Sequence, residues 1–395
     1  SLTAQTFTSG IDLLNTEEWA KCYWQAFQNG NNGNNPNSQL FGNGPAPVIA
    51  DTYQSGDKTM PLADTDWAKE IYSTALMQNY NLSLTRGGEN GSSSLSVNYI
   101  DHDGTCRNTD YKSFNTRLSG SYHFLDNRLR IGENVAVTCW TKHNNPGGIE
   151  EQLFKMMPMV PVYATDGSYG GGYVDVLNDS PNPIRLTDNE ANNKHLYWRI
   201  FGNAYVEVEP VKNLVLRSNF GLNYYNEENS VFTPSWQEGA RNVGTNELEV
   251  SNAQQYNWIW TNQVQYSIDF GKNSLTALLG VEAKREQYDF FRSYGTGLEY
   301  EDPDYRYLDA VTSGKNVGGT ASVYSMVSYF GKLNYSYDGR YLASVTVRRD
   351  ASSRFGKYNN SGIFPSVSLG WRLSKEKFLS SAKGWLDDLK IRAAW

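Results

Sequence analysis

Apolar and polar residues alternate with a period of two along most of the chain. In segments 80–85 and 95–99, Leu, Val and Tyr take one set of positions while Asn, Ser and Thr take the other. Successive side chains of a strand point to opposite sides, so this pattern predicts strands whose two faces meet different environments. We expect about 13 such strands, each longer than the roughly 9 to 11 residues that a tilted strand needs to cross a bilayer. The alternation recurs at 129–137, 200–208, 214–224, 258–270, 275–281, 327–335, 341–347 and 363–371.

The connections between these strands alternate between short and long. Gly, Pro, Asn and Asp mark tight turns, while the connections on the opposite side run to dozens of residues. Outer-membrane barrels have this organisation, with short periplasmic turns and long extracellular loops. The weakest point of the scheme is 103–110, a short connection on the long side. Tight turns are expected at 87–91, 125–128, 209–213, 270–273 and 337–340, and long loops at 11–77, 142–196, 227–255 and 290–323.

Tyr and Trp gather at the ends of the predicted strands. Amphipathic rings favour the lipid headgroup zone, so this placement supports an all-β, antiparallel transmembrane β-barrel. The alternative is a soluble all-β protein with exposed Tyr, which would need a second sheet to cover the apolar faces. The strand-end aromatics are Tyr197, Trp198, Tyr224, Tyr225, Tyr256, Trp258, Trp260, Tyr335, Tyr337 and Trp371.

One helix is predicted inside the first long loop. Asn15 or Thr16 can cap it, and acidic residues fill its first turn, where the helix dipole favours them. Trp19, Tyr23 and Phe27 follow at helical spacing before Asn29 and Gly30 end the helix.

Composition narrows the class of protein. Aromatic residues make up 14% of the chain and charged residues only 19%, which argues against a disordered chain. The formal net charge of −7 and the lack of a Lys/Arg cluster argue against a nucleic-acid partner. No run of eighteen apolar residues occurs, which excludes a transmembrane helix from the sequence and leaves a transmembrane barrel open.

The ends of the chain and its cysteines add little about chemistry. Cys22, Cys106 and Cys139 form no C-x-x-C pair, so we expect three incidental thiols. Residues 1–10 lack the pattern of an export signal, which is expected upstream or already removed. Because strand alternation continues to Trp395, we expect the chain to be a piece of a longer protein.

Signals for catalysis are weak. His102, His123, His143 and His195 show no metal-binding spacing, and no P-loop is present, so we predict no catalytic residues, metal or cofactor. The segment 101–104 is faintly similar to a calcium loop but lacks the remaining acidic ligands. The glycines at 170–172 could hold an anion, although a flexible loop tip is the simpler interpretation.

Transport requires a different set of residues. Flat aromatic faces, planar amides and carboxylates bind sugars and peptides, so aromatic residues in the long loops are candidates for substrate binding. Loop packing or partner contact is the alternative role for each. The candidates are Tyr163, Tyr169, Tyr173, Trp236, Tyr294, Tyr300, Tyr305 and Tyr307. Inward-facing residues that solvate the lumen or face a plug are expected to include Arg217, Asn219, Asn223, Gln263, Gln265, Lys332 and Asn334.

Two blocks of the sequence resemble a known family. Residues 65–67 and 77–83, with the Gly pair at 87–88, resemble the early barrel of SusC/RagA-like TonB-dependent transporters. Residues 348–379 resemble the mid-barrel signature of that family, and 385–392 are similar to the family's next segment. We expect structural roles for these motif residues; Arg349, Asp350 and Arg354, for instance, would fix a strand-to-loop junction by charge-assisted hydrogen bonds. The motif residues are Asp66, Trp67, Arg349, Asp350, Ser352, Ser353, Arg354, Phe355, Gly356, Phe364, Pro365 and Trp371.

The resemblance implies a 22-stranded barrel in the full protein, plugged by an N-terminal domain and energised through the TonB complex. Residues 1–395 would then be a partial barrel domain, with the plug and the last strands outside it. The implied function is import of oligosaccharides or peptides across the outer membrane of a Gram-negative bacterium. The expected partners are outer-membrane lipid and a SusD-like surface lipoprotein, which the long loops would contact. The alternatives are a ferric-siderophore receptor and a non-transport barrel such as an adhesin.

Overall fold

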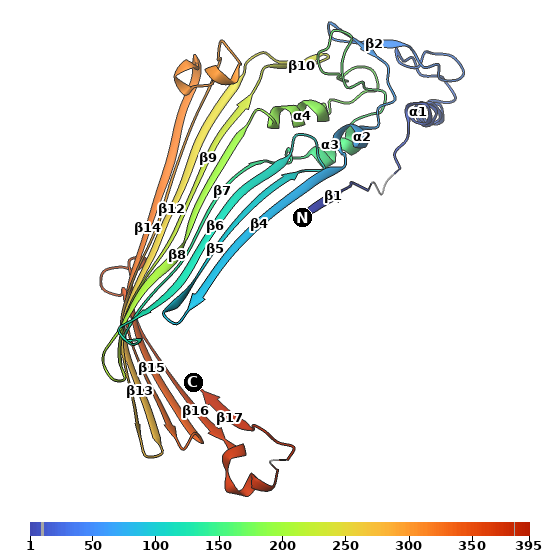
Figure 1. The fold of residues 1–395 in the computed structure, drawn as a ribbon. Coiled ribbons are helices and arrows are strands. Elements are labelled where there is room, and N and C mark those ends of the chain that lie inside the picture. The colour runs from blue at the N-terminus through green and yellow to red at the C-terminus, as the bar shows by residue number, and fades with distance from the viewer. Residues whose placement is uncertain (9–11, 383) are drawn as a thin grey trace.

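One curved antiparallel sheet dominates the computed structural model, which describes residues 1–8, 12–382 and 384–395 (Figure 1). Its 13 strands follow one another in chain order, with β1 at one edge and β17 at the other. The strands are β1 (Leu2–Gln5), β4 (Ala75–Gly88), β5 (Gly91–Asp103), β6 (Asp110–Phe124), β7 (Leu129–His143), β8 (Lys194–Val211), β9 (Leu214–Thr233), β12 (Glu247–Phe270), β13 (Asn273–Thr296), β14 (Ser313–Tyr337), β15 (Tyr341–Ser352), β16 (Ser361–Arg372) and β17 (Lys390–Ala394).

The predicted all-β, antiparallel architecture is confirmed, whereas the length of the edge strands and the extent of two loops were wrong. The edge strands β1 and β17 have only 4 and 5 residues, too few to cross a bilayer. The predicted loops 227–255 and 290–323 are shorter than expected, because β9, β12, β13 and β14 continue into them. There the ladder of backbone hydrogen bonds persists while the side chains lose their apolar alternation, so the pattern no longer marks the strand. The first residue of the predicted loop 11–77 lies outside the described residues.

The short turns set the register of the sheet. Asp338 and Gly339 both have positive φ, at 53° and 60°, and the Arg340 backbone N–H donates to the Tyr337 carbonyl at 2.9 Å, which closes a tight turn. The three-residue connection 338–340 leaves Tyr337 opposite Tyr341, and the pairing continues without a shift to Met326 opposite Ser352. This register decides which side chains share a face.

The two faces of the sheet differ in polarity and in exposure. The apolar face is the exposed one, which is the reverse of what a water-soluble sheet shows. Val345 lies opposite Leu333 and Val367, and its side chain shares their face. Exposed fractions on that face reach 63% at Leu82 and Leu279, whereas Ser328, on the polar face, is 0% exposed. A water-soluble sheet buries its apolar face, whereas a transmembrane barrel presents it to lipid.

The predicted helix is confirmed as α1 (Thr16–Gly30). Asn15 accepts a hydrogen bond from the Glu18 backbone, and Glu18 accepts one from the Asn15 backbone, which forms a capping box. Three short helices were missed, since segments of 5 to 8 residues carry little periodicity. They are α2 (Trp67–Ile71), α3 (Ile149–Lys155) and α4 (Pro183–Glu190). Within the described ranges, no helix is both long and apolar enough to cross a membrane.

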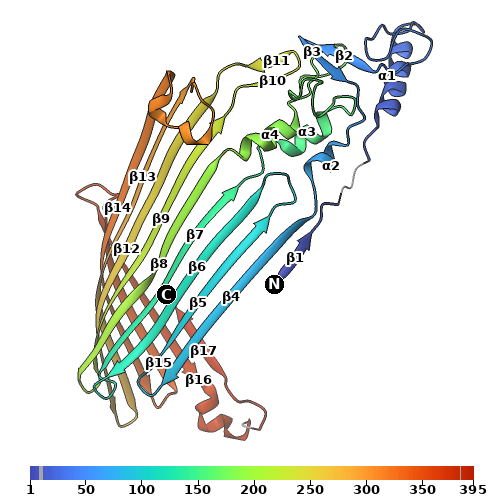
Figure 2. The same cartoon turned by 45° about the horizontal axis from the view of Figure 1, so that its top comes forward.

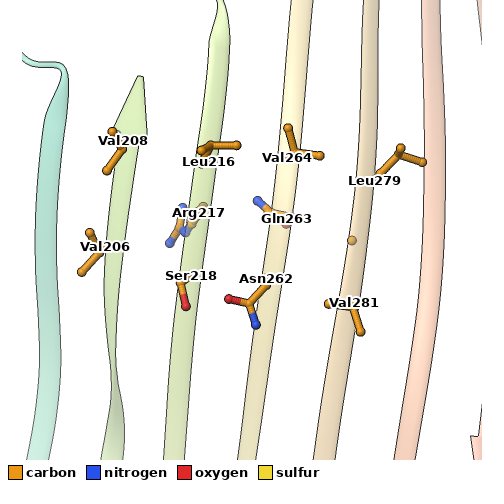
Figure 3. Close-up of a pocket in the computed structure, with 11 residues that line it drawn as sticks. Val206, Val208, Leu216, Arg217, Ser218, Asn262, Gln263, Val264, Leu279 and Val281 are labelled. Atoms are coloured by element: carbon orange, nitrogen blue, oxygen red, sulfur yellow. The ribbon is translucent and has the colours of Figure 1, made fainter. Parts of the chain in front are cut away.

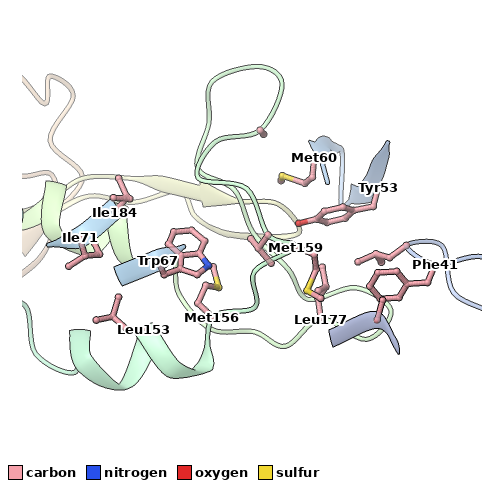
Figure 4. Close-up of a cluster of buried hydrophobic side chains, with 14 of the residues drawn as sticks. Phe41, Tyr53, Met60, Trp67, Ile71, Leu153, Met156, Met159, Leu177 and Ile184 are labelled. Atoms are coloured by element: carbon pink, nitrogen blue, oxygen red, sulfur yellow. The ribbon is translucent and has the colours of Figure 1, made fainter. Parts of the chain in front are cut away.

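The long connections fold into a packed cap at the end of the sheet opposite the short turns (Figures 1 and 2). Segments from 16–71 and 149–184 share one apolar core there, which Figure 4 shows around Trp67, Met159 and Ile184. Two small sheets complete the cap, β2 (Thr52–Ser55) with β3 (Lys58–Pro61) and β10 (Trp236–Glu238) with β11 (Arg241–Val243). Four short 3-10 helical turns lie in other connections: η1 (Pro303–Tyr305), η2 (Leu308–Ala310), η3 (Leu373–Lys375) and η4 (Lys377–Ala382).

Candidate ligand-binding wall

The polar face of the sheet, here called the inner wall, carries an ion network that spans three strands. Arg348 on β15 donates from Nη2 to Glu282 on β13 at 2.7 Å and to Ser328 on the intervening β14 at 2.8 Å. Its Nε donates to Asp350 at 2.6 Å. Phe330, also on β14, lies against Gly280, where a Cβ atom would stand only 2.2 Å from the phenyl ring. The wall is thus tightly packed and polar at this level.

The residues that were predicted to face inward share this wall. Gln263 pairs with Arg217 on one side and Gly280 on the other, and Gly280 pairs with Phe330. Phe330 in turn pairs with Arg348. Because side chains in register share a face, the pairing confirms one common face for the whole set. The remaining members are Asn219, Asn223, Gln265, Lys332 and Asn334.

Three aromatic rings form a shelf on the inner wall near the cap. Trp140 and Tyr197 stack with ring centroids 5.0 Å apart and planes 4° apart. Tyr225 joins them at 6.1 Å from Trp140 and donates its hydroxyl to Glu227 at 2.9 Å. Asn229 also donates to Glu227, at 2.9 Å. This aromatic shelf, Trp140, Tyr197 and Tyr225, combines flat apolar rings with a fixed carboxylate.

Amide and tyrosine side chains continue the wall from the shelf across β12, β13 and β14. Tyr225 pairs with Gln255, which pairs with Tyr288. Two residues further along the same face of these strands, Asn223 pairs with Asn257. A hollow of about 230 Å³ lies along this strip, with Gln255, Asn257, Glu286, Tyr288, Tyr324 and Arg354 among its lining residues. Planar amides beside aromatic rings are the groups that satisfy the hydroxyl and apolar faces of a sugar, or the amides of a peptide.

A half-buried histidine–carboxylate pair lies at the rim of the shelf, next to α4. The ring of His195 is 3.5 Å from Glu190 through Nε2 and 2.7 Å from the Asn229 amide oxygen through Nδ1. Burial by itself raises the pKa of Glu190, but hydrogen bonds from His195, Asn144 and Asn193 outweigh it and lower the pKa. Glu190 is therefore ionised and joins the cap to the wall.

The prediction that the strand-end aromatics all lie in the headgroup zone was wrong for two of them. Tyr197 is 4% exposed and Tyr225 stacks beside it on the inner wall. Their sequence neighbours Trp198 and Tyr224 take the opposite face, and Trp198 is 42% exposed. The parity of each strand separates the two faces, so counting from the apolar positions could have found the shelf.

The loop aromatics that were predicted to bind substrate fall into several environments. Tyr163 is exposed and its ring centroid lies 5.9 Å from that of Tyr169, whose hydroxyl donates to Asp188 at 3.1 Å. Tyr173 is exposed, while the Trp236 ring packs 4.0 Å from the Arg185 guanidinium. The structure does not bring the eight residues into one site.

The remaining predicted aromatics lie at the end of β13 and in the connection that follows it. Tyr294 is on the inner wall opposite Glu249, and its hydroxyl accepts a hydrogen bond from Asn316 at 3.1 Å. Tyr300 and Tyr305 lie 5.5 Å apart, and with Tyr307 they form an exposed group on the connection between β13 and β14.

The early family motif makes contacts within the cap. Asp66 caps α2 by accepting from the Lys69 backbone, and Trp67 is 3% exposed with its indole donating to the Met157 carbonyl at 3.2 Å.

The later motif surrounds the end of β15, and its ion pairing differs from the expectation. Asp350 pairs with Arg348, whereas Arg349 reaches Ser361 at 3.3 Å and the Arg354 guanidinium lies 4.3 Å from the Tyr324 ring. Arg349 and Asp350 are adjacent in a strand, so they point to opposite faces and cannot act together.

The other motif residues have these surroundings. Ser352 accepts from the Arg354 backbone and Ser353 from the Ser325 backbone. Phe355 and Phe364 are exposed, and Gly356 has open space where a Cβ atom would stand. Pro365 lies opposite Val347 in the pairing of β15 with β16. The Trp371 indole donates to Glu376 at 3.0 Å.

A shallow hollow on the opposite, apolar face has a different character (Figure 3). Its volume is about 540 Å³, and Val206, Leu216, Val264 and Leu279 are among its lining residues. Such a lining suits lipid chains better than a hydrophilic substrate. The inner wall is therefore the better candidate for binding.

A sheet that exposes its apolar face and carries a polar, aromatic inner wall defines the class of transmembrane barrel proteins. No protein-family model matches the chain. It is 26% identical over 97% of its length to TonB-dependent receptor P3 of Formosa agariphila, covering 36% of that protein. It is 27% identical over 86% of its length to TonB-dependent receptor SusC of Bacteroides thetaiotaomicron, covering 36% of that protein.

The structure agrees with these similarities. The RagAB peptide importer in its closed-closed state superposes on the whole chain with a TM-score of 0.75 at 19% identity, and 45% of the importer chain is covered. The open-open state gives a TM-score of 0.73 at 20% identity, covering 95% of this chain and 43% of that one. The resemblance to SusC/RagA-like TonB-dependent transporters is thereby confirmed, as is the outer-membrane location. The chain spans about a third of the length of the curated relatives it matches.

Proposed function

We propose that this chain forms part of the wall of a TonB-dependent transporter that imports oligosaccharides or peptides across the outer membrane. The observation that carries the proposal is the division of one sheet into a lipid-suited face and an inner wall with the aromatic shelf. A passage for a hydrophilic solute requires this arrangement, since the solute exchanges water contacts for polar and aromatic ones. We propose transport and no catalysis, in keeping with relatives that are named as receptors and importers.

The proposed machinery extends beyond this chain. In the whole protein, residues 1–395 would form one part of a barrel whose other strands close it, with a plug inside and a segment that contacts TonB. The long connections would hold a SusD-like lipoprotein, because the exposed tyrosine group of the β13–β14 connection, Tyr300, Tyr305 and Tyr307, offers amphipathic contact area beyond the membrane. Tyr163 and Tyr173, also exposed, would take part in the same contact or meet the substrate.

Uptake measurements test the proposal. In the bacterium that carries the full-length gene, labelled oligosaccharides and peptides are offered to wild-type cells, to a deletion of the gene and to a strain without TonB. We expect uptake of at least one class to require both genes. Uptake of ferric complexes alone would favour a siderophore receptor, and a deletion that affects adhesion but no uptake would favour a non-transport barrel. Gentle detergent extraction of the full-length protein is expected to recover a lipoprotein, and recovery of a bare monomer would contradict the partner.

A further inference from the structure

Three cations on the inner wall each lie against an aromatic ring. The rings hold these cations close to the wall by cation–π attraction, which leaves N–H donors available, although Arg199 Nε donates to Asn223 Oδ1 at 3.2 Å. Lys142 Nζ is 5.1 Å from the Tyr197 centroid, Arg199 Cζ is 5.6 Å from the Phe201 centroid, and Arg354 Cζ is 4.3 Å from the Tyr324 centroid.

The register places all three pairs on the ligand-binding wall. Tyr197 belongs to the aromatic shelf, and Arg199 lies opposite Tyr225 of the same shelf. Phe201, 55% exposed, lies opposite Asn223. Tyr324 and Arg354 line the hollow of about 230 Å³ at the other end of the amide strip. The cations therefore lie along the inner wall from β7 to the turn that follows β15.

These cations differ from several other charges on the inner wall, which form ion pairs. Lys284 pairs with Glu286, Arg130 with Glu207, and Arg348 with Glu282. By contrast, Lys142, Arg199 and Arg354 have no carboxylate within 4.0 Å in the part of the chain that the structure describes. Glu227, the carboxylate of the shelf, accepts from Tyr225 and Asn229 instead. Three cations without an ion-pair partner among the described residues thus share this wall with the carboxylate of Glu227, in a chain whose formal net charge is −7.

We propose that the inner wall selects an anionic oligosaccharide, one that carries carboxylate or sulfate groups. This inference rests on the proposed import function and names its substrate class. Guanidinium groups bind carboxylate and sulfate oxygens through paired N–H donors, and an ammonium group binds them as a point charge. The rings and amides between the cations would contact the uncharged faces and hydroxyls of the sugar units. A neutral sugar would leave all three cations without a counter-charge.

Binding measurements on the full-length protein in detergent test this inference. The probes are an oligogalacturonate tetrasaccharide, a sulfated carrageenan tetrasaccharide, neutral maltotetraose and a Glu-rich peptide. We expect the two anionic saccharides to bind, the neutral one to bind at least tenfold more weakly, and the affinity to fall as NaCl rises from about 0.05 to about 0.5 M. The peptide is expected to bind more weakly than both anionic saccharides, because it offers the rings no sugar face.

A pair of triple variants separates local recognition from overall charge. Arg199→Gln, Lys142→Gln and Arg354→Gln together should weaken binding of the anionic saccharides roughly 10- to 100-fold, if each exposed contact contributes two- to fivefold. The control combines Arg86→Gln, Arg128→Gln and Lys212→Gln, which remove the same charge at the short turns or the strand end beside them. It should bind like the wild type.

Every outcome bears on the inference. Equal affinity for maltotetraose, tightest binding of the peptide, no binding of either anionic saccharide, or equal losses in the two triple variants would each overturn it. Failure of the import function gives a different result, because anionic saccharides would then bind while uptake in cells would not depend on TonB. Conversely, TonB-dependent uptake with tight binding of neutral sugars would leave import in place and remove the selectivity.

Discussion

Arg348 and Glu282 form an ion pair across an intervening strand. They belong to β15 and β13, and the 2.7 Å contact passes over Ser328 on β14, whose side chain is small enough to lie beneath it. Ser328 itself accepts from the same guanidinium at 2.8 Å. One side chain thus joins three strands of the inner wall.

This pair should contribute measurably to the stability of the barrel. We expect Glu282→Gln or Arg348→Gln to lower the free energy of unfolding by about 1 to 2 kcal/mol, since each leaves a partly buried charge short of its partner. A double-mutant cycle in the full-length protein, followed by urea unfolding in lipid vesicles, measures the coupling. Arg349→Gln is the matched control, because Arg349 points to the opposite face and should change stability by less than about 0.5 kcal/mol. Additive single effects would contradict the pair.

Tyr225 of the aromatic shelf should contribute to ligand affinity, whereas its sequence neighbour Tyr224 should not. Tyr225 faces the inner wall and Tyr224 the apolar face. Tyr225→Ala should weaken binding of the imported substrate roughly 2- to 12-fold, the range expected for loss of one aromatic contact. Tyr224→Ala should leave affinity unchanged. Titration calorimetry on the full-length protein compares them, and equal losses would place the ligand elsewhere.

Stability should fall in acid through Glu376, beside η3. Hydrogen bonds from Trp371 and Tyr341 lower the pKa of Glu376 below its ordinary value of 4.5. A carboxylate with a lowered folded-state pKa contributes stability above its unfolded-state pKa, and that contribution is lost as pH falls through the folded-state pKa. We therefore expect a loss below about pH 4.5 that Glu376→Gln reduces. Thermal unfolding of both proteins at stepped pH tests this, and identical pH profiles would contradict it.

The sequence predicted the faces of the sheet better than the site. At 341–347 the alternation is clear, because lipid and water lie on the two sides of a regular strand. Near the cap Tyr224 and Tyr225 are the same residue type, so residue type alone does not separate them, and only the parity counted from the apolar positions of 214–222 does. The cap was least predictable, since its structure depends on contacts between distant segments. Arg185 and Glu238, for example, form a buried ion pair between residues 53 apart in sequence.

The thiols should differ sharply in reactivity. Cys22 on α1 is exposed, whereas Cys106 is buried and burial raises its pKa to about 11. Because the thiolate is the nucleophile, Cys106 should resist alkylation at neutral pH while Cys22 reacts readily. Mass spectrometry after a timed iodoacetamide reaction measures both sites in one sample. Denaturation should abolish the difference, and rapid labelling of Cys106 in the folded protein would show that the cap is open.

The membrane assignment can be tested with two neighbouring residues of β15. Val345 lies between Leu333 and Val367 on the apolar face, and Ser344 lies between Asn334 and Ser368 on the inner wall. An Arg at a mid-bilayer, lipid-facing site costs roughly 2 to 4 kcal/mol, whereas an Arg on the inner wall keeps its charge in water. Val345→Arg should therefore reduce folding yield and thermal stability far more than Ser344→Arg.

Ser344 is a better comparison than Thr346, although both share the inner wall. Thr346 lies opposite Lys332, so Thr346→Arg would place like charges side by side and add a cost unrelated to lipid. The turn at Asp338 and Gly339 holds the register, so the strand cannot easily slip by one residue to exchange its faces. Both variants are made in the full-length protein. Thermal stability is compared by the temperature at which the folded barrel changes its mobility on a gel, and folding yield by the fraction that folds into vesicles. Equal damage, or greater damage from Ser344→Arg, would mean that the apolar face packs against protein instead of lipid.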